Sequence, residues 1–317
     1  MRSIELLDGS LLKDKRSLKK LDFWFKLMNK PNGWHYDLDH LWILKKLKNY
    51  NIKPGSTILD AGAGQGILQY ILCSMGYNVI SLDFSPRSIP NKTKGIFKIF
   101  GQGKKNIKYS HDYMKVISYG NKSDGGTILK NGFFEKLKKF KTKNLPEYIR
   151  RTLNLVRSDA LYFYHRIFMS NAHFGTIKHL RAAFHDIPIG SNKIDAIVSV
   201  SAIEHSDINL FENSLSELLR VLIPGGPLLI TTSATKKKEN IMHAKSSGWC
   251  FSLGFLKKYI SPQTIYFDVS KTENTLFNSK IFYKRLDPYY YKDPEAFCYQ
   301  KKIKKFPYLP VGINIIK

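Results

Sequence analysis

The sequence is poor in three things: long hydrophobic runs, cysteine and acidic residues. No run of about 18 apolar residues occurs, so we expect no membrane-spanning helix. The three cysteines, Cys73, Cys250 and Cys298, are far apart and form no Cys-x-x-Cys pair, which argues against a zinc site or a disulfide framework. The first residues carry acids and no long apolar stretch, so no secretory signal is expected and a reducing cytosol is the expected compartment.

Acidic residues number 25 against 51 Lys and Arg, which gives a formal net charge of +26. Residues 91–181 carry 20 basic against 5 acidic residues and residues 236–317 carry 16 against 6, whereas residues 182–235 carry 2 against 6. Lys supplies 41 of the basic residues and Arg only 10, although sites that recognise phosphates or bases favour Arg. We therefore expect a general basic surface or an acidic small substrate, and a nucleic-acid partner is the less favoured alternative.

What the sequence does contain is a glycine-rich turn between a predicted strand and a predicted helix. The β-branched and apolar residues 57–61 lead into three glycines at every second position, Gly62, Gly64 and Gly66. Glycine lets the backbone approach a ligand closely, and the helix that follows offers free N–H groups. A dinucleotide-binding turn would need its third glycine at position 67, which is Ile67 here.

Three further segments follow in order. A second predicted strand, residues 78–83, ends in Asp83, whose carboxylate can accept hydrogen bonds from both ribose hydroxyls, while Phe84 can cover an adenine face. Asp186, Ile187 and a proline then precede the apolar run 195–205. The last segment, residues 217–232, is a predicted helix that stops at Pro-Gly-Gly before another strand.

In this order the four segments resemble the class I S-adenosylmethionine-dependent methyltransferases, and in particular their small-molecule, type 11-like branch. The family's motif is an apolar pair, Asp or Glu, one residue and then Gly-x-Gly-x-Gly, and its fifth strand follows Arg-Val-Leu-x-Pro-Gly-Gly. The resemblance covers about residues 40–90 and 182–235. It implies an α/β fold with a seven-stranded Rossmann-like sheet, in the order 3-2-1-4-5-7-6, and a helical cap insertion.

The resemblance also implies S-adenosyl-L-methionine as cofactor and no metal. Asp186 and Ile187 match an acid and an apolar residue that sit beside the adenine, and Ser201 lies at the end of the fourth strand, which faces the transferred methyl. The implied cofactor-binding residues are Asp60, Gly62, Gly64, Gly66, Asp83, Phe84, Asp186, Ile187 and Ser201.

Two segments bear on the acceptor. Enzymes that methylate base amines typically carry Asn/Asp-Pro-Pro-Tyr after the fourth strand, where this chain has Glu204 and His205, a pair similar to the small-molecule branch. We expect His205 to act as a general base, because its ordinary pKa suits proton removal near neutral pH, or else to cap the next helix together with Glu204. Glu204 would orient that ring or bind the acceptor. Trp34 and Tyr36 would border the acceptor pocket or, equally, join two helices.

The predicted organisation is a single methyltransferase domain with two additions. Residues 1–50 are predicted as N-terminal helices, and residues 51–317 as the cofactor-binding domain. An inserted helical cap is expected at about residues 91–176, because the plain fold needs only about one helix and one strand there. We predict the third strand at residues 177–181 rather than 106–109, and the last strands at residues 264–269 and 311–316.

Three functions remain open on the sequence. The leading one is methyl transfer to a small molecule, such as a sugar or a surface-glycan precursor. The alternative is an RNA or protein methyltransferase that uses the basic cap and C-terminal arm. The third is a binding protein without activity, against which the intact glycines and both acids argue.

Overall fold

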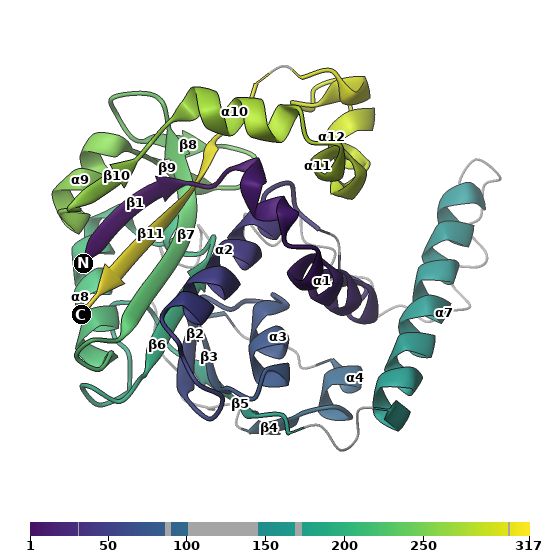
Figure 1. The fold of residues 1–317 in the computed structure, drawn as a ribbon, viewed down its shortest axis with the longest axis horizontal. Helices are drawn as coiled ribbons and strands as arrows, with labels where there is room; N and C mark the ends of the chain where they lie inside the picture. Colours follow the sequence, from purple (N-terminus) through teal and green to yellow (C-terminus); the bar gives the residue numbers. More distant parts are fainter. Residues whose placement is uncertain (31, 86–89, 101–144, 169–172, 304) are drawn as a thin grey trace.

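The computed structural model describes the chain except residues 31, 86–89, 101–144, 169–172 and 304 (Figure 1). The strands are β1 (Arg2–Leu6), β2 (Thr57–Ala61), β3 (Asn78–Asp83), β4 (Lys98–Phe100), β5 (Thr176–Arg181), β6 (Ala196–Val200), β7 (Pro227–Thr235), β8 (Ile241–His243), β9 (Gly248–Ser252), β10 (Thr264–Tyr266) and β11 (Leu309–Ile316). The α-helices are α1 (Lys15–Leu27), α2 (Tyr36–Asn49), α3 (Leu68–Ser74), α4 (Asn91–Lys94), α7 (Leu145–Phe168), α8 (Phe211–Val221), α9 (Leu253–Ile260), α10 (Val269–Phe277), α11 (Lys280–Arg285) and α12 (Tyr289–Lys292). The short 3-10 helices are η1 (Gly9–Lys13), η3 (Ile203–His205), η4 (Ile208–Leu210) and η5 (Tyr299–Lys301).

These strands form one mixed sheet. Nine of them follow the order β10-β1-β11-β7-β6-β2-β3-β5-β4, and β8 and β9 attach beside β7. The strands from β7 through β6, β2, β3 and β5 are parallel, while β11 is antiparallel to β7. The carboxyl ends of the parallel strands therefore meet at one edge, where open α/β sheets bind ligands.

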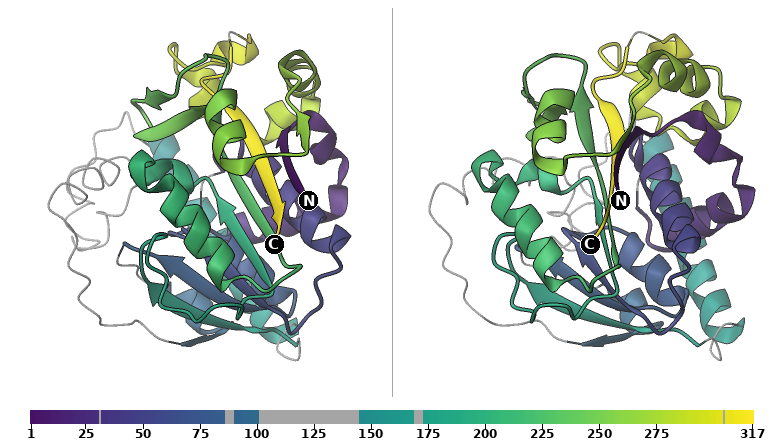
Figure 2. Two further views of the ribbon diagram at one scale, coloured as in Figure 1. Left: turned by 90° about the vertical axis from the view of Figure 1, so that its left-hand side faces the viewer. Right: turned by 60° about the vertical axis from the view of Figure 1, so that its left-hand side comes forward.

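Helices cover both faces of this sheet (Figure 2). α8 and α9 lie on one face, and α1, α2 and α3 lie on the other. All nine residues of β7 are buried, as expected for a central strand that is covered on both sides. The apolar residues of α8 recur at helical spacing and are buried, so that its polar side faces water.

The sheet confirms the predicted Rossmann-like α/β fold but corrects its strand count and order. We predicted seven strands, and the described residues form eleven. The expected strands keep their relative order, but β1 lies between β11 and β10, and β4 extends the far edge. Residues 2–6 could not be recognised as a strand, because their partner β11 lies about 300 residues away in the sequence.

The N-terminal segment and the insertion also take definite places. α1 and α2 occupy the region predicted to be helical. The third strand is β5, as predicted, whereas the alternative at residues 106–109 lies outside the described residues. Most of the predicted cap lies outside them as well.

The helix α7, at the described end of the insertion, packs against α1 (Figure 1). Ser158 Oγ donates a hydrogen bond of 2.5 Å to the carbonyl of Leu27, and the ring of His165 stacks on Phe23 with centroids 5.6 Å apart. In the part of the chain that the structure covers, no helix has the length and apolar character needed to cross a membrane.

Candidate functional site

The glycine turn after β2 is bent by two positive φ angles. Gly62 has φ of +74° and Gly64 has φ of +47°, a region that favours glycine. The N–H of Gly62 donates to the carbonyl of Leu82 at 2.8 Å, which ties the turn to the end of β3. A Cβ at Gly62 would lie 2.3 Å from the Cβ of Ala202, so glycine is also required by the close approach of the segment after β6.

Asp83, at the end of β3, faces this turn. Its Oδ2 accepts a 2.7 Å hydrogen bond from the N–H of Gly64, and its Oδ1 accepts one of 2.8 Å from the N–H of Ser85. A carboxylate offers about four lone-pair sites, so each oxygen keeps capacity for a further donor. A Cβ built on Gly64 would meet only Asp83 Oδ2, at 3.8 Å, which shows open space beside the carboxylate. This arrangement fits a ribose with two hydroxyls.

The remaining predicted cofactor residues lie at or after the carboxyl ends of β2, β3 and β5 or in the turn itself. Asp60 is buried at the end of β2, Phe84 is half-buried after β3, and Ile187 is buried after β5. Asp186 is exposed. Gly66 completes the turn, with its N–H donating to the carbonyl of Ala63 at 2.9 Å.

A pair of side chains on α8 that the sequence analysis missed holds the loop that carries Asp186 and Ile187. Arg220 donates from Nη2 to the carbonyl of Ile187 at 2.9 Å and from Nη1 to the carbonyl of Ile189, also at 2.9 Å. Glu217 Oε2 accepts from the N–H of Ile187 at 3.1 Å, and Arg220 Nε donates to Glu217 Oε1 at 2.6 Å. The hydrogen bond from Arg220 lowers the pKa of Glu217, so the carboxylate stays charged and available.

Ser201 follows β6 in a conformation that is uncommon for serine. Its φ is +43°, and its N–H donates to the carbonyl of Thr231 at 2.9 Å. Among the described residues, its buried hydroxyl has no hydrogen-bond partner. A strained residue with an unsatisfied hydroxyl at a ligand-binding edge is typical of a functional position.

Glu204 and His205 differ in burial, although both side chains lie beside Gly248 of β9. Glu204 is buried, its Oε2 accepts a 2.8 Å hydrogen bond from Thr232 Oγ1, and burial raises its pKa. His205 is exposed, with Nδ1 3.4 Å from the carbonyl of Ser247. A Cβ on Gly248 would lie 2.9 Å from the ring of His205, so the absence of a side chain at this position of β9 leaves room for the imidazole.

Trp34 and Tyr36 also differ from each other. Trp34 is buried and stacks on Phe306, with centroids 5.1 Å apart and planes at 17°, so it anchors the C-terminal segment. Tyr36 is 38% exposed and its ring meets His35 edge-on at 5.1 Å. The structure therefore places Trp34 in the core and leaves Tyr36 accessible.

Between these two residues begins a hydrogen-bonded chain that sequence reasoning missed. His35 Nδ1 lies 2.6 Å from Asp39 Oδ2, and His35 Nε2 lies 3.1 Å from the hydroxyl of Tyr308. An ionised carboxylate only accepts, so Nδ1 carries the proton and Nε2 accepts from the Tyr308 hydroxyl. The four-residue spacing of His35 and Asp39 on a helix start was visible in the sequence, but Tyr308 is 273 residues from His35.

Strand pairing places the hydrogen-bonded residues Asp39, His35 and Tyr308 near the end of the parallel strands. Tyr308 directly precedes β11, whose Leu309 pairs with Ala234 near the end of β7. The ring of His243, on β8, meets Tyr308 at 5.1 Å. Burial raises the pKa of Tyr308, and the charges of Tyr290, Glu204 and Tyr36 raise it further. His35 contacts the ring of Tyr36 and the hydroxyl of Tyr308, and Glu204 is bonded to Thr232, which pairs with Val311 of β11, three residues after Tyr308. We call His35, Tyr36, Glu204 and Tyr308 the acceptor cluster.

Cysteine and metal chemistry receive no support from the described part of the chain. Burial raises the pKa of Cys73 to about 12 and that of Cys250 to about 12, so neither thiol is poised as a nucleophile. Within the same residues, no three His, Cys, Asp or Glu side chains are grouped so that they could hold a metal ion.

Comparison with known proteins gives one matching family model and many solved structures that are similar to this chain. The family described as "Methyltransferase domain" matches residues 153–230, a stretch that includes Asp186, Ser201 and the Glu204–His205 pair but not the glycine turn. No curated protein matches the chain.

Three of the similar solved structures match this chain over different shares of its length. A SAM-dependent methyltransferase from Aquifex aeolicus is 14% identical over 69% of this chain and 76% of its own, with a TM-score of 0.34. A phosphoethanolamine N-methyltransferase from Haemonchus contortus is 14% identical over 97% and 59%, with a TM-score of 0.44. The [4+2]-cyclase SpnF is 11% identical over 98% and 97%, with a TM-score of 0.43. Against three other structures, the chain spans 66%, 57% and 50% of their length.

Proposed function

We propose that this chain, a member of the class I S-adenosylmethionine-dependent methyltransferases, transfers a methyl group to a small molecule that presents a hydroxyl or an amine, for example a sugar or a surface-glycan precursor. S-adenosyl-L-methionine is its cofactor and supplies an activated methyl group on a sulfonium. The observation that carries the choice of acceptor is the acceptor cluster, His35, Tyr36, Glu204 and Tyr308, beside the end of β7. Its Glu204 follows Ala202, which packs against Gly62 of the glycine turn. The buried free thiols suit a reaction in the cytosol.

Cofactor binding is assigned to the glycine turn and to the ends of β2, β3 and β5. The open backbone at Gly64 would admit the cofactor, and Asp83 would accept from the ribose hydroxyls. Phe84 and Ile187 would flank the adenine, and Asp186 would meet its polar edge. Asp60 and Ser201 would face the part of the cofactor nearest the methyl group.

Tyr308 is assigned to orient the acceptor. Its hydroxyl proton is directed to His35 Nε2, so its oxygen, which lies beside the indole of Trp34, keeps acceptor capacity for a donor on the acceptor. Because its pKa is raised by burial, Tyr308 stays protonated near neutral pH and does not serve as a base. A hydroxyl or an amine on the acceptor is the group that such an oxygen would recognise.

His205 is assigned as the general base. It is exposed in the chain after β6, and its neighbour Glu204, a member of the acceptor cluster, is buried. An imidazole with an ordinary pKa of about 6.5 can take a proton from an attacking hydroxyl, or from the ammonium that forms when a neutral amine attacks the methyl group, near neutral pH. Glu204 would hold the acceptor side of the site through Thr232 rather than the ring of His205.

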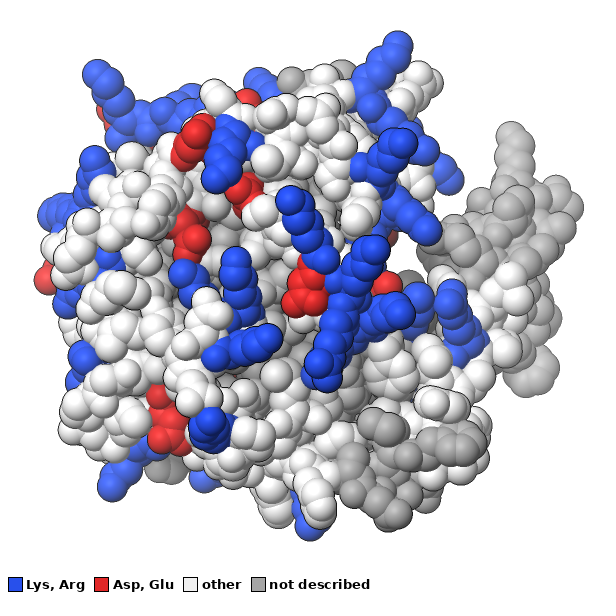
Figure 3. Space-filling view, in the orientation of Figure 1, with Lys and Arg blue, Asp and Glu red and all other residues white. Residues whose placement is uncertain are grey.

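A polymeric acceptor fits these features less well. His35 and Glu204 are 5% and 3% exposed, which suits a compact ligand better than a polymer that must lie along an open track. Figure 3 shows Lys and Arg spread over most of the visible face with acids among them. Scattered lysines of this kind give general solubility and long-range attraction rather than base recognition.

The test follows the fate of a labelled methyl group. The purified protein would be incubated with S-adenosylmethionine, labelled on its methyl group, and with the low-molecular-weight, RNA and protein fractions of a cell extract. We expect label in the low-molecular-weight fraction, resistant to nuclease and protease, and we expect it to fall in the variant Tyr308→Phe. Label that is sensitive to nuclease or protease would contradict the proposal. Calorimetry with the cofactor alone would show separately whether the cradle binds it.

A further inference from the structure

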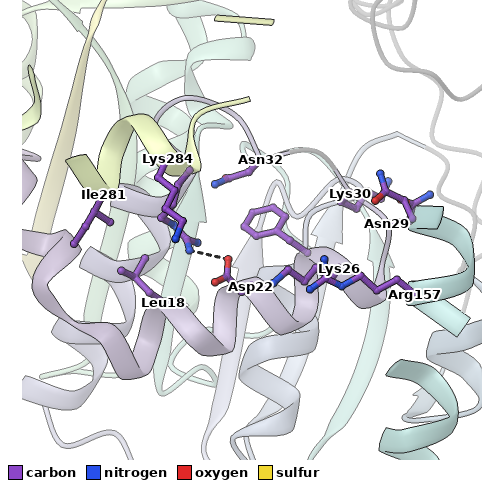
Figure 4. A pocket seen from close by; sticks show the side chains of 12 residues that line it. Leu18, Asp22, Lys26, Asn29, Lys30, Asn32, Arg157, Ile281 and Lys284 are labelled. Carbon is purple, nitrogen blue, oxygen red and sulfur yellow. Dashed lines mark ion pairs between the residues drawn. The ribbon is translucent and has the colours of Figure 1, made fainter. Parts of the chain in front are cut away.

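A cavity that includes no residue of the glycine turn lies between three helices. It measures about 560 Å³, is open on one side and is lined by α1, α7 and α11 together with the chain that follows α1 (Figure 4). This volume falls within the range of small-molecule sites, roughly 300–1,000 Å³. Its lining residues are Leu18, Asp22, Phe25, Lys26, Asn29, Lys30, Asn32, Asn154, Arg157, Ile281, Lys284 and Arg285.

The charges of this cavity are strongly unequal. Five basic side chains line it against one acidic side chain, Asp22. Asp22 is already engaged, because its Oδ1 lies 2.7 Å from Arg285 Nη1. Among the described residues, the other four cations, Lys26, Lys30, Arg157 and Lys284, have no acidic partner, and Figure 4 shows Lys26 and Arg157 extending toward each other. Like charges that converge in a hollow raise the local concentration of anions.

Arg285 is fixed as part of the wall rather than left as a free cation. Its Nε and Nη2 donate to the two carboxylate oxygens of Asp37 at 2.8 and 3.0 Å. Asn32 Nδ2 donates to Asp37 as well, at 2.8 Å. These bonds join the start of α2 to α11 and hold one side of the cavity rigid.

The ends of two helices offset part of the positive charge. Lys26 lies in the last turn of α1, and Lys284 lies in the last turn of α11, where cations stabilise a helix dipole. Each helix end carries about half a negative charge at most. Four cations without an acidic partner among the described residues exceed that, and Arg157 comes from the body of α7 and serves no helix end.

We infer that this cavity binds a phosphorylated small molecule, with the phosphate groups held by Lys26, Lys30, Arg157 and Lys284. Arg157 offers the planar fork that matches phosphate oxygens, and the lysines add mobile charges. The apolar residues Leu18, Phe25 and Ile281 give the organic part of the ligand a surface to pack against. The inference goes beyond methyl transfer and does not depend on it.

The test is titration calorimetry of the full chain with inorganic pyrophosphate at near-physiological salt. We expect saturable binding, at least about tenfold weaker in the double variant Lys26→Gln/Arg157→Gln, because each charge-assisted bond contributes about that factor. The matched control is Lys257→Gln, an exposed lysine on α9 on the other side of the molecule, which should bind like the wild type. The variant Asp22→Asn should bind more tightly, because it removes the only acidic residue of the lining and frees Arg285 Nη1, while Asp37 still holds the rest of the guanidinium.

Several results would overturn the inference. These are no binding by the wild type, equal binding by the double variant and Lys257→Gln, or loss of binding in Asp22→Asn with an unchanged melting curve. A short single-stranded RNA provides the remaining arm. RNA binding with a steep salt dependence, without pyrophosphate binding, would assign the basic side chains to a nucleic acid instead.

Discussion

The cofactor cradle depends on single residues whose roles differ in kind. Gly62 is set by space, because Ala202 leaves no room for a Cβ. Gly64 is set by its backbone angle, because a Cβ there would meet almost nothing. Asp83 is set by its lone pairs, two of which already accept backbone N–H groups. Substitutions at these three positions should therefore fail for different reasons.

Asp83→Ala should weaken binding of S-adenosylmethionine. The variant loses the acceptor for the ribose hydroxyls and the bond that holds the N–H of Gly64, together about 1–3 kcal/mol, so the dissociation constant should rise roughly tenfold to a hundredfold. Calorimetry measures this directly. Asp83→Asn, which keeps one acceptor oxygen, should lie between the two. If Asp83→Ala binds as tightly as the wild type, Asp83 does not hold the ribose.

His205→Ala should separate chemistry from cofactor binding. The ring is exposed and lies beside Ser247 and Gly248 rather than against the glycine turn, so the cofactor affinity should be unchanged. Without the base, kcat for the acceptor should fall by roughly 10²–10⁴. The acidic limb of the pH–rate profile should disappear with it. Unchanged kcat with the limb retained would show that His205 is not the base.

Glu204 should make the stability of the protein depend on pH. Burial raises its pKa in the folded state above the ordinary value of 4.5, so the folded protein holds a proton that the unfolded chain releases. Below pH about 4.5 Glu204 is protonated in both the folded and the unfolded state and has no effect on the pH dependence of stability. As the pH rises toward and through the folded pKa, the free energy of unfolding falls by about 1.4 kcal/mol for each unit by which the folded pKa exceeds the ordinary one.

Glu204→Gln removes that titration and keeps an oxygen for Thr232. Relative to the wild type, the variant should gain stability between pH 5 and pH 8, as measured by urea unfolding at each pH. The control is Glu212→Gln, an exposed residue on α8, which should run parallel to the wild type. If the variant instead becomes less stable than the wild type as the pH rises, Glu204 is charged and stabilising in the folded protein.

At the scale of elements, α8 does more than cover the sheet. Its Glu217 and Arg220 reach across to the backbone between Ile187 and Ile189, so a helix on one face fixes a loop at the cofactor edge. Arg220, the arginine of the Arg-Val-Leu-x-Pro-Gly-Gly link, thus positions this loop, a role that its place in the motif did not indicate. The Pro-Gly-Gly stop itself follows the prediction, with Gly225 at φ of +78°.

Arg220→Met should loosen this loop without emptying the core. We expect the free energy of unfolding to fall by roughly 1 kcal/mol, because the side chain is partly exposed and its hydrogen bonds are screened. The dissociation constant for S-adenosylmethionine should rise several-fold, because Asp186 and Ile187 lose their support. Arg16→Gln, an exposed substitution on α1, is the control. Equal cofactor affinity in Arg220→Met and Arg16→Gln would contradict the positioning role.

At the scale of the whole molecule, the sheet brings the two ends of the chain together. β1 pairs with β11 along its whole length, and the N–H of Ile316 donates to the carbonyl of Met1 at 2.8 Å. The chain after α12 returns over α2, where Phe306 stacks on Trp34 and Tyr308 reaches His35. The acceptor cluster therefore exists only when both ends of the chain are in place.

The sequence by itself determined the parts of this protein that depend on local patterns. The glycine turn, Asp83, the strands around them and the Pro-Gly-Gly stop are set within short stretches by backbone freedom and hydrophobic periodicity, and these predictions were confirmed in position. Only the tertiary structure decided that Glu204 is buried and His205 exposed, because burial depends on distant elements such as β7 and β9. It also supplied β1, the Asp39–His35–Tyr308 chain and the basic cavity, because their members are joined by sheet pairing and helix packing across hundreds of residues.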